Sequence, residues 1–205
     1  MAQSATLAMG AGGARARLRI ETRASHAALD ALPVALALAR GEADRATYLR
    51  ALQATASVFG RLEAAAREAL PEGNAFAARW PARAPCLRAD IAALGGAEWG
   101  VEAMPAACDS APQALGWLYV LEGSLLGGQA IRRRLIETGR WWSLQPLSFH
   151  ALPKDTAAAR WGATLALLDA HVASARELAC AAVAARDAFD AFIKAFARDG
   201  DAIDR

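Results

Sequence analysis

Three glycines inside one predicted helix are the most unusual feature of the sequence. Gly123, Gly127 and Gly128 lie in the segment LYVLEGSLLGGQ, in a chain that otherwise uses alanine as its small residue. Each glycine costs about 1 kcal/mol relative to alanine in a helix interior. Gly123 and Gly127 are four residues apart, so they leave bare backbone on one helix face. That face suits either close approach of a large flat ligand or a tight helix–helix crossing, and it also permits a kink.

A histidine on the first predicted helix is the second candidate. His26 lies at the edge of an apolar stripe, and Arg19, Arg23 and Asp30 share its side of the helix at steps of three or four residues. The imidazole could ligate a metal while the arginines bind anionic groups. The alternative is a surface histidine paired with Asp30. One histidine cannot build a zinc site, but it can be the single protein ligand of a haem iron, because the porphyrin supplies four nitrogens.

Composition predicts one all-α domain to position these residues. The chain has 205 residues, of which 55% are hydrophobic, and its net charge is +2. Val, Ile, Thr, Tyr and Phe are too sparse for an all-β domain. No concentrated basic tract supports binding to nucleic acid or membrane, and no apolar run could span a bilayer. Three cysteines without a CxxC motif argue against a disulfide scaffold, so we expect a soluble cytoplasmic protein.

Hydrophobic periodicity and capping residues predict roughly seven or eight helices and no strands. The glycine-rich residues 1–13 are expected to be a disordered leader, and residues 14–205 the domain. Loops or irregular segments are expected at 97–109 and 141–153. The helices are expected at 14–32, 33–41, 44–70, 74–80, 85–94 and 110–138, with two more after Asp155, the last carrying Phe189, Phe192 and Phe196 as core residues.

Two segments of the sequence resemble motifs of one family. TRASHAALD, residues 22–30, is similar to the proximal-helix motif of the biliverdin-producing haem oxygenases. The glycine segment resembles their distal helix, most closely that of bacterial members with a Glu-Gly-Ser start, including those associated with bacterial phytochromes. The order and separation of the two motifs also agree. The resemblance extends over residues 14–198 and implies a single-domain, all-α haem oxygenase-like bundle with a glycine-kinked distal helix.

The resemblance implies a haem site with named residues. His26 would be the proximal ligand of the iron, and Gly123 and Gly127, with Gly128 behind them, would lie over the distal face and leave room for dioxygen. Arginines would bind the propionates, because the guanidinium can hold a carboxylate with two hydrogen bonds. For the run of arginines after the glycines, the alternative is a solvated helix end. The expected haem-binding set beyond His26 and the glycines is Thr22, Arg19, Arg23, Arg132 and Arg133, with Arg160 as a further propionate candidate.

Ser124 departs from the pattern of many family members, which carry an aspartate directly after the first distal glycine. A hydroxyl can hold a water but supplies no negative charge, so proton delivery would depend on water and backbone groups. The residues expected to act in catalysis are therefore Gly123, Ser124 and Gly127. Glu122 is expected at the surface.

The function implied by the resemblance is oxidative opening of haem, which is both cofactor and substrate, to biliverdin, carbon monoxide and ferrous iron. Because the sequence has no flavin or nucleotide motif, a ferredoxin or flavoprotein would supply the electrons. Biliverdin could feed a phytochrome, or the purpose could be iron acquisition. Two alternatives remain open: a non-catalytic haem carrier or sensor on the same fold, and a helical interaction domain in which the glycines only pack helices.

Overall fold

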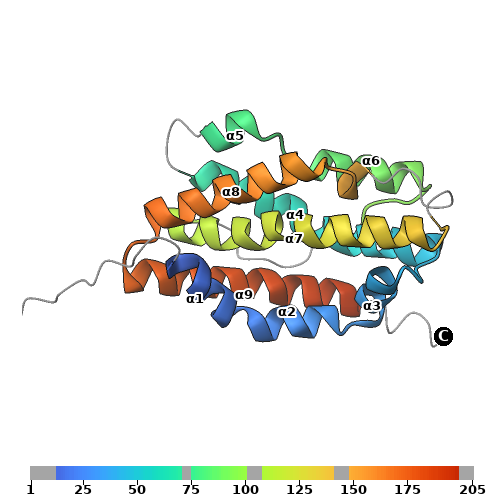
Figure 1. Cartoon of the computed structure of the whole chain (residues 1–205), viewed down its shortest axis with the longest axis horizontal. Helices are drawn as coiled ribbons and strands as arrows, with labels where there is room; N and C mark the ends of the chain where they lie inside the picture. Colours follow the sequence, from blue (N-terminus) through green and yellow to red (C-terminus); the bar gives the residue numbers. More distant parts are fainter. Residues whose placement is uncertain (1–12, 71–74, 101–107, 141–147, 199–205) are drawn as a thin grey trace, which may run out of the picture.

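The computed structural model describes residues 13–70, 75–100, 108–140 and 148–198, and within these ranges it contains helices and no strand (Figure 1). Residues 1–12 of the leader expected at 1–13 lie outside the described residues, as do residues 141–147 of the irregular segment expected at 141–153, whereas Gly13 begins the first helix. The helices are α1 Gly13–Glu21, α2 Arg23–Asp30, α3 Pro33–Arg40, α4 Arg45–Ala69, α5 Ala75–Arg79, α6 Ala84–Ala93, α7 Ala111–Glu137, the 3-10 helix η2 Ser148–His150, α8 Lys154–His171 and α9 Ala175–Ala197.

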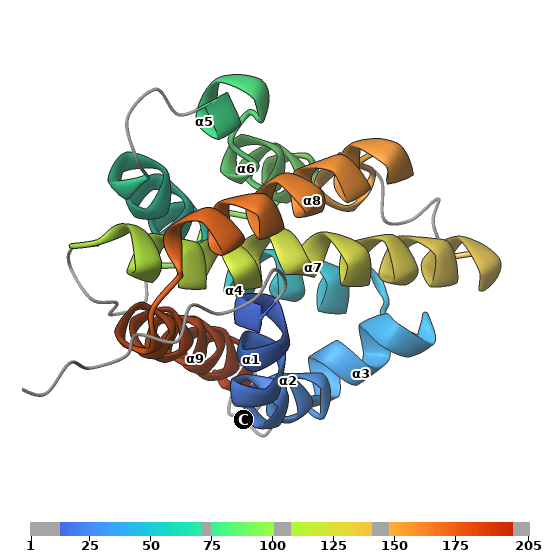
Figure 2. The ribbon, with the colours of Figure 1, turned by 60° about the vertical axis from the view of Figure 1, so that its left-hand side comes forward.

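Helix α7 is the centre of the bundle. It packs against α9, α8, α4 and α3, while α4 also contacts α9 and α6. Figure 2 shows α8 crossing over one side of α7 and the three N-terminal helices lying on the other side. Helix α7, which carries the glycine segment, is therefore in contact with most of the other long helices.

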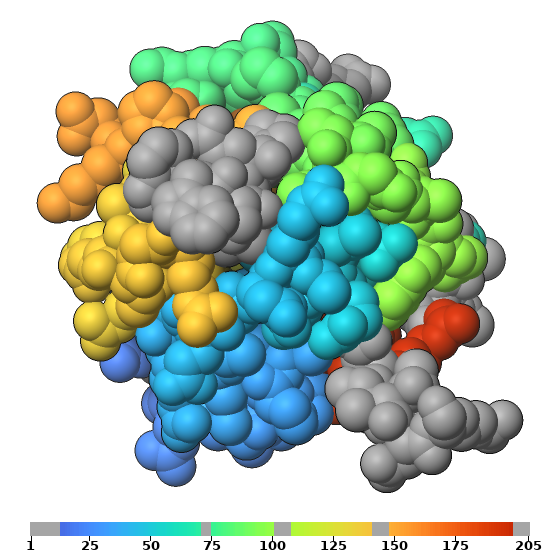
Figure 3. Space-filling model, turned by 90° about the vertical axis from the view of Figure 1, so that its right-hand side faces the viewer, coloured from blue at the N-terminus to red at the C-terminus, as the bar shows by residue number. Residues whose placement is uncertain are grey.

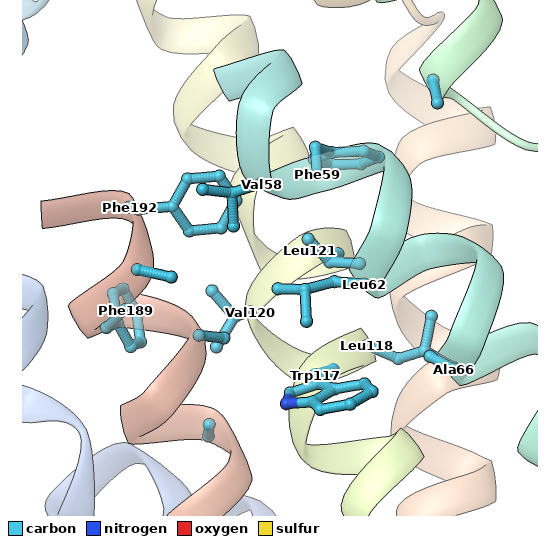
Figure 4. Packing of buried hydrophobic residues seen from close by; sticks show 14 of the residues in the cluster. Val58, Phe59, Leu62, Ala66, Trp117, Leu118, Val120, Leu121, Phe189 and Phe192 are labelled. Carbon is cyan, nitrogen blue, oxygen red and sulfur yellow. The ribbon is translucent and has the colours of Figure 1, made fainter. Parts of the chain in front are cut away.

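The hydrophobic core lies where α4, α7 and α9 meet (Figure 4). Trp117 and Leu121 of α7 are buried among Phe59 and Leu62 of α4, and Phe192 projects toward them from α9. Burial of such side chains stabilises the fold by about 1.5–3 kcal/mol each.

Capping residues confirm several of the predicted helix ends. Asp44 accepts a hydrogen bond from the Thr47 amide at 2.8 Å, and Ser110 caps α7 in the same way. Gly41 ends α3 with φ +70°, a left-handed conformation that favours glycine. The Thr138 hydroxyl donates to the Gly41 carbonyl at 3.0 Å, which ties the end of α7 (yellow) to the end of α3 (blue) at the face shown in Figure 3.

The prediction of one helix over 14–32 is wrong, because the segment forms α1 and α2 with a bend at Thr22. The Thr22 hydroxyl donates to the Leu18 carbonyl at 2.7 Å. Hydroxyls that bond the backbone one turn earlier compete with the helical ladder and often bend the helix. The bend sets the direction of α2 and therefore the position of His26.

Among the described residues, no helix combines the length and the apolar character needed to cross a membrane.

Candidate functional site

A largely apolar cavity of about 550 Å³ is enclosed by residues of α2, α3, α4, α7, η2, α8 and α9. Its size lies within the range of roughly 300–1,000 Å³ that is usual for small-molecule and cofactor sites. The lining is mostly aliphatic and aromatic. Its polar side chains are His26, Asp30, Thr55, Tyr119, Ser124, His150 and the indole of Trp161.

Gly123 and Gly127 face this cavity rather than a neighbouring helix. A Cβ atom at Gly127 would meet nothing within 4 Å, and one at Gly123 would make only ordinary contact, at 3.6 Å, with the Trp161 ring. The tight helix crossing lies instead at Gly116, where a Cβ would lie 2.2 Å from the Ala181 carbonyl oxygen of α9. Of the two interpretations of the glycine pair, the geometry therefore favours an open ligand face, within a helix that continues unbroken to Glu137.

His26 lines the cavity, and it also forms the expected pair with Asp30. Its Nδ1 lies 2.8 Å from Asp30 Oδ2, and its ring centroid lies 5.5 Å from that of Phe189. A hydrogen bond at Nδ1 fixes the tautomer and leaves the Nε2 lone pair for a metal, as is usual for ligating histidines. The surface pair and the ligand role are thus compatible in one side chain.

The structure brings together only part of the predicted haem-binding set. His26, Gly123, Ser124, Gly127 and Gly128 line the cavity. Thr22 is buried outside the lining, and its hydroxyl interacts with Tyr119, which does line the cavity. No arginine of the described residues lines the cavity. The predicted haem-binding arginines are all exposed, namely Arg19, Arg23, Arg132 and Arg133.

Glu122 and Arg160 are not where the sequence predicted them. Both are almost fully buried, and the Arg160 guanidinium donates two hydrogen bonds to the Glu122 carboxylate, with Nε to Oε2 at 2.8 Å. Arg160 also donates to the Pro81 carbonyl at 2.8 Å. Glu122 thus faces α8 rather than solvent, at a position about 100° around α7 from Gly123. Arg160 is therefore committed to this ion pair, and it does not line the cavity.

Arg83 is a second buried cation, which the sequence analysis did not identify. Its guanidinium lies 5.0 Å and 4.5 Å from the ring centroids of Phe59 and Phe149, two residues of the cavity wall. It donates to the Leu121 carbonyl at 3.0 Å and, more weakly, to Ser124 Oγ at 3.5 Å. Burial lowers the pKa of Arg83 to about 10, so it is positively charged at neutral pH.

His150 is the other site residue that the sequence analysis missed. It lines the cavity from η2, and its Nδ1 lies 2.8 Å from the Tyr48 hydroxyl. The buried Asp90 carboxylate of α6 holds η2 in place by accepting hydrogen bonds from the Phe149 amide, at 2.8 Å, and from Ser148. Burial, and then the charge of Arg83, lower the pKa of His150 to about 3, so its imidazole is neutral at physiological pH.

The apolar wall of the cavity includes the three phenylalanines of the last helix. Phe189, Phe192 and Phe196 were expected to be core residues, and all three also line the cavity. Together with the Trp161 ring they supply the flat, water-excluding surfaces that suit an aromatic ligand.

Comparison with known proteins identifies the family. The family model described as Heme oxygenase matches residues 13–198. The fold is similar to that of haem oxygenase-1 from the cyanobacterium Synechocystis in complex with haem, with a TM-score of 0.68 and 16% identity over 93% of this chain and 94% of that chain. It is also similar to the NO- and CO-bound haem oxygenase of Neisseria meningitidis, with a TM-score of 0.64 and 22% identity over 90% and 92%. No curated protein sequence matches this chain. The fold, the cavity and a family match that spans most of the chain lead to one conclusion: this chain belongs to the haem oxygenase family.

Proposed function

We propose that this chain is a haem oxygenase that binds haem in the cavity and opens the ring to biliverdin, carbon monoxide and ferrous iron, using dioxygen and external electrons. The observation that carries the proposal is that one apolar cavity joins the His26 imidazole to the bare backbone of Gly123 and Gly127. A histidine can ligate the iron of a bound haem, and two unobstructed glycines on another helix leave room for a large flat ring.

The residues of the cavity fit a haem by size, polarity and ligand chemistry. The lining is apolar over most of its area, as the porphyrin ring requires, and His26 has Nε2 free of protein hydrogen bonds within the described residues. The propionates require cations, and the exposed Arg19, Arg23, Arg132 and Arg133 are the candidates for them, since long arginine side chains can reorient to bind a carboxylate.

Bound haem supplies the redox chemistry, and the protein supplies orientation and environment. The Asp30 carboxylate orients the His26 imidazole by its hydrogen bond at Nδ1. The backbone at Gly123 and Gly127 keeps the adjacent space open, because no side chain projects there. The phenyl wall of α9 excludes water, and the buried Arg83 places a positive charge behind Ser124.

The electron donor and the fate of the product are further parts of the proposal. We infer a ferredoxin or flavoprotein donor, because the sequence has no flavin or nucleotide motif. A phytochrome is the proposed recipient of biliverdin, on the basis of the resemblance to phytochrome-associated members. The proposed location is the cytoplasm.

The test is an absorption titration of the purified protein with haem, followed by addition of ascorbate, or of ferredoxin and its reductase, in air. We expect a histidine-ligated Soret band that decays as a biliverdin band grows. His26→Ala should abolish the histidine-ligated spectrum. His171→Ala is the matched control, because His171 lies at the end of α8 outside the cavity lining. Binding without ring opening would instead indicate a carrier or sensor, and no binding would indicate a helical interaction domain.

A further inference from the structure

The glycine segment of α7, residues 123–128, offers the cavity no free hydrogen-bond donor. The Ser124 hydroxyl donates to the Leu121 carbonyl at 2.6 Å and is approached by the Arg83 guanidinium at 3.5 Å, so its hydrogen is already used. The amides of Gly123 and Gly127 lie inside a continuous helix, where each bonds to the carbonyl four residues earlier. A polar ligand beside these glycines therefore needs a donor from another part of the cavity.

The hydrogen bond between the Tyr48 hydroxyl and His150 indicates which group can be that donor. Tyr48 is completely buried, and burial, together with the Asp90 carboxylate, raises its pKa, so the hydroxyl is neutral and must donate its hydrogen. Within the described residues its one acceptor is Nδ1 of His150, at 2.8 Å. A neutral imidazole that accepts at Nδ1 carries its hydrogen on Nε2.

The other nitrogen of His150 has no partner in the protein. Among the described residues no hydrogen bond is made by Nε2, although the imidazole lines the cavity. The imidazole packs over Gly128, where a Cβ atom would lie 2.8 Å from Cδ2 and 3.8 Å from Nε2. The third glycine of the segment thus has a different task from the first two, since it makes room for the histidine.

The position of the ring is fixed from several sides. Phe149 lies against it with ring centroids 5.1 Å apart, and Asp90 anchors the turn that carries both residues. The charged and titratable groups that surround the ring are Tyr48 on α4, Arg83 at the start of α6 and Asp90 on α6. A buried hydrogen-bonded network of this kind holds a side chain in one orientation.

We propose that Tyr48 fixes His150 as the Nε2–H tautomer, and that this N–H donates a hydrogen bond in the cavity to a small polar ligand, water or a diatomic gas, held at the haem. The ligand part of this inference rests on the proposed function. Gly128 and Asp90 act as positioning residues for the imidazole. A neutral N–H donor thereby serves where many relatives use a carboxylate.

The tautomer is tested in the haem-free protein by nitrogen NMR of ¹⁵N-histidine-labelled samples at pH 7. We expect His150, assigned by its loss in His150→Gln, to show a protonated Nε2 and an unprotonated Nδ1. Tyr48→Phe should convert this signal to a mixture of tautomers. Tyr119→Phe, which removes the hydroxyl of a tyrosine that lines the cavity, should leave it unchanged. An Nδ1–H tautomer or a charged imidazole in the parent protein would overturn the inference.

The donor role is tested by infrared spectroscopy of the CO complex of the ferrous haem protein and by the dissociation rate of dioxygen. We expect His150→Leu to raise the CO stretching frequency and to speed dioxygen release about tenfold, the effect of losing one hydrogen bond of ordinary strength. Gly128→Ala should act in the same direction by displacing the ring. Unchanged values in both variants, with normal haem binding, would overturn the donor role. If the parent protein bound no haem, the proposed function and the ligand part would fall together, while NMR would still decide the tautomer.

Discussion

The imidazole Nδ1 of His26 lies 2.8 Å from the carboxylate Oδ2 of Asp30, one turn further along α2. Both side chains are nearly two-thirds exposed, at 63% and 65%, so the pair adds little to the stability of the fold. The pair instead determines which nitrogen of the imidazole is free, because a hydrogen bond at Nδ1 leaves Nε2 as the nitrogen that can bind a metal.

Asp30→Asn should preserve haem binding but weaken it. Removal of an outer-shell partner usually lowers metal affinity by about 10–100-fold, and an exposed pair belongs at the lower end of that range. Because the histidine becomes a weaker electron donor, the iron–histidine stretching frequency should fall in resonance Raman spectra. Asp155→Asn, on α8 outside the cavity lining, is the control. An unchanged frequency in Asp30→Asn would show that the pair does not tune the ligand.

Gly127→Ala should make the protein more stable and less able to bind haem. A Cβ there meets nothing within 4 Å, so the helix should gain about 0.5–1 kcal/mol in unfolding free energy while the methyl group intrudes on the ligand space. Gly162→Ala on α8 is the matched control, since its Cβ also meets nothing and it lies outside the lining. Urea unfolding and haem titration of the two variants separate the effects. Equal haem affinity in both would remove Gly127 from the site.

Glu122→Leu should destabilise the fold strongly. The substitution leaves the Arg160 guanidinium buried without its carboxylate, which costs about 3–5 kcal/mol. The double variant Glu122→Leu/Arg160→Met should recover much of this loss, because an apolar pair leaves no uncompensated charge. Arg17→Met, which breaks an exposed pair with Glu21, should change stability by less than about 1 kcal/mol. A mild effect of Glu122→Leu on urea unfolding would mean that water reaches Arg160.

His150 should make the fold less stable as the pH falls from 6.5 toward 3. The unfolded chain binds a proton at this imidazole below about pH 6.5, whereas the folded protein binds it only near pH 3, so protonation favours the unfolded state between these values. The slope approaches about 1.4 kcal/mol per pH unit for one proton. Urea unfolding between pH 7 and 5 should show a steeper loss for the parent protein than for His150→Gln, and parallel profiles would contradict the pKa shift. The carboxylates of Asp44 and Glu177, whose pKa values are lowered by their capping hydrogen bonds, act equally in both proteins.

Local signals in the sequence were sufficient for most of the fold. Asp44 and Gly41 marked helix ends correctly, and Ser110 was one of two adjacent candidates, with Asp109, for the cap of α7, because capping depends on residues within one turn. Apolar periodicity likewise predicted the long helices α4, α7 and α9. The bend at Thr22 was missed because a hydrophobic pattern does not show whether a threonine hydroxyl bonds to solvent or to the backbone.

The site was predictable only where its residues are close in sequence. His26 with Asp30, and Gly123 with Gly127, are pairs four residues apart on one helix. His150 and its partner Tyr48 are 102 residues apart, and no local pattern connects them. The burial of Glu122 with Arg160 was missed for the same reason, since only the packing of α8 on α7 shows that the two side chains are buried together.

The contact of His26 with Phe189 brings together the second helix and the last one. The ribosome synthesises α2 long before α9, and until α9 has emerged the cavity lacks the phenyl rings that line it. Formation of the ligand site is therefore a late event in the folding of the chain, since it waits for Phe196.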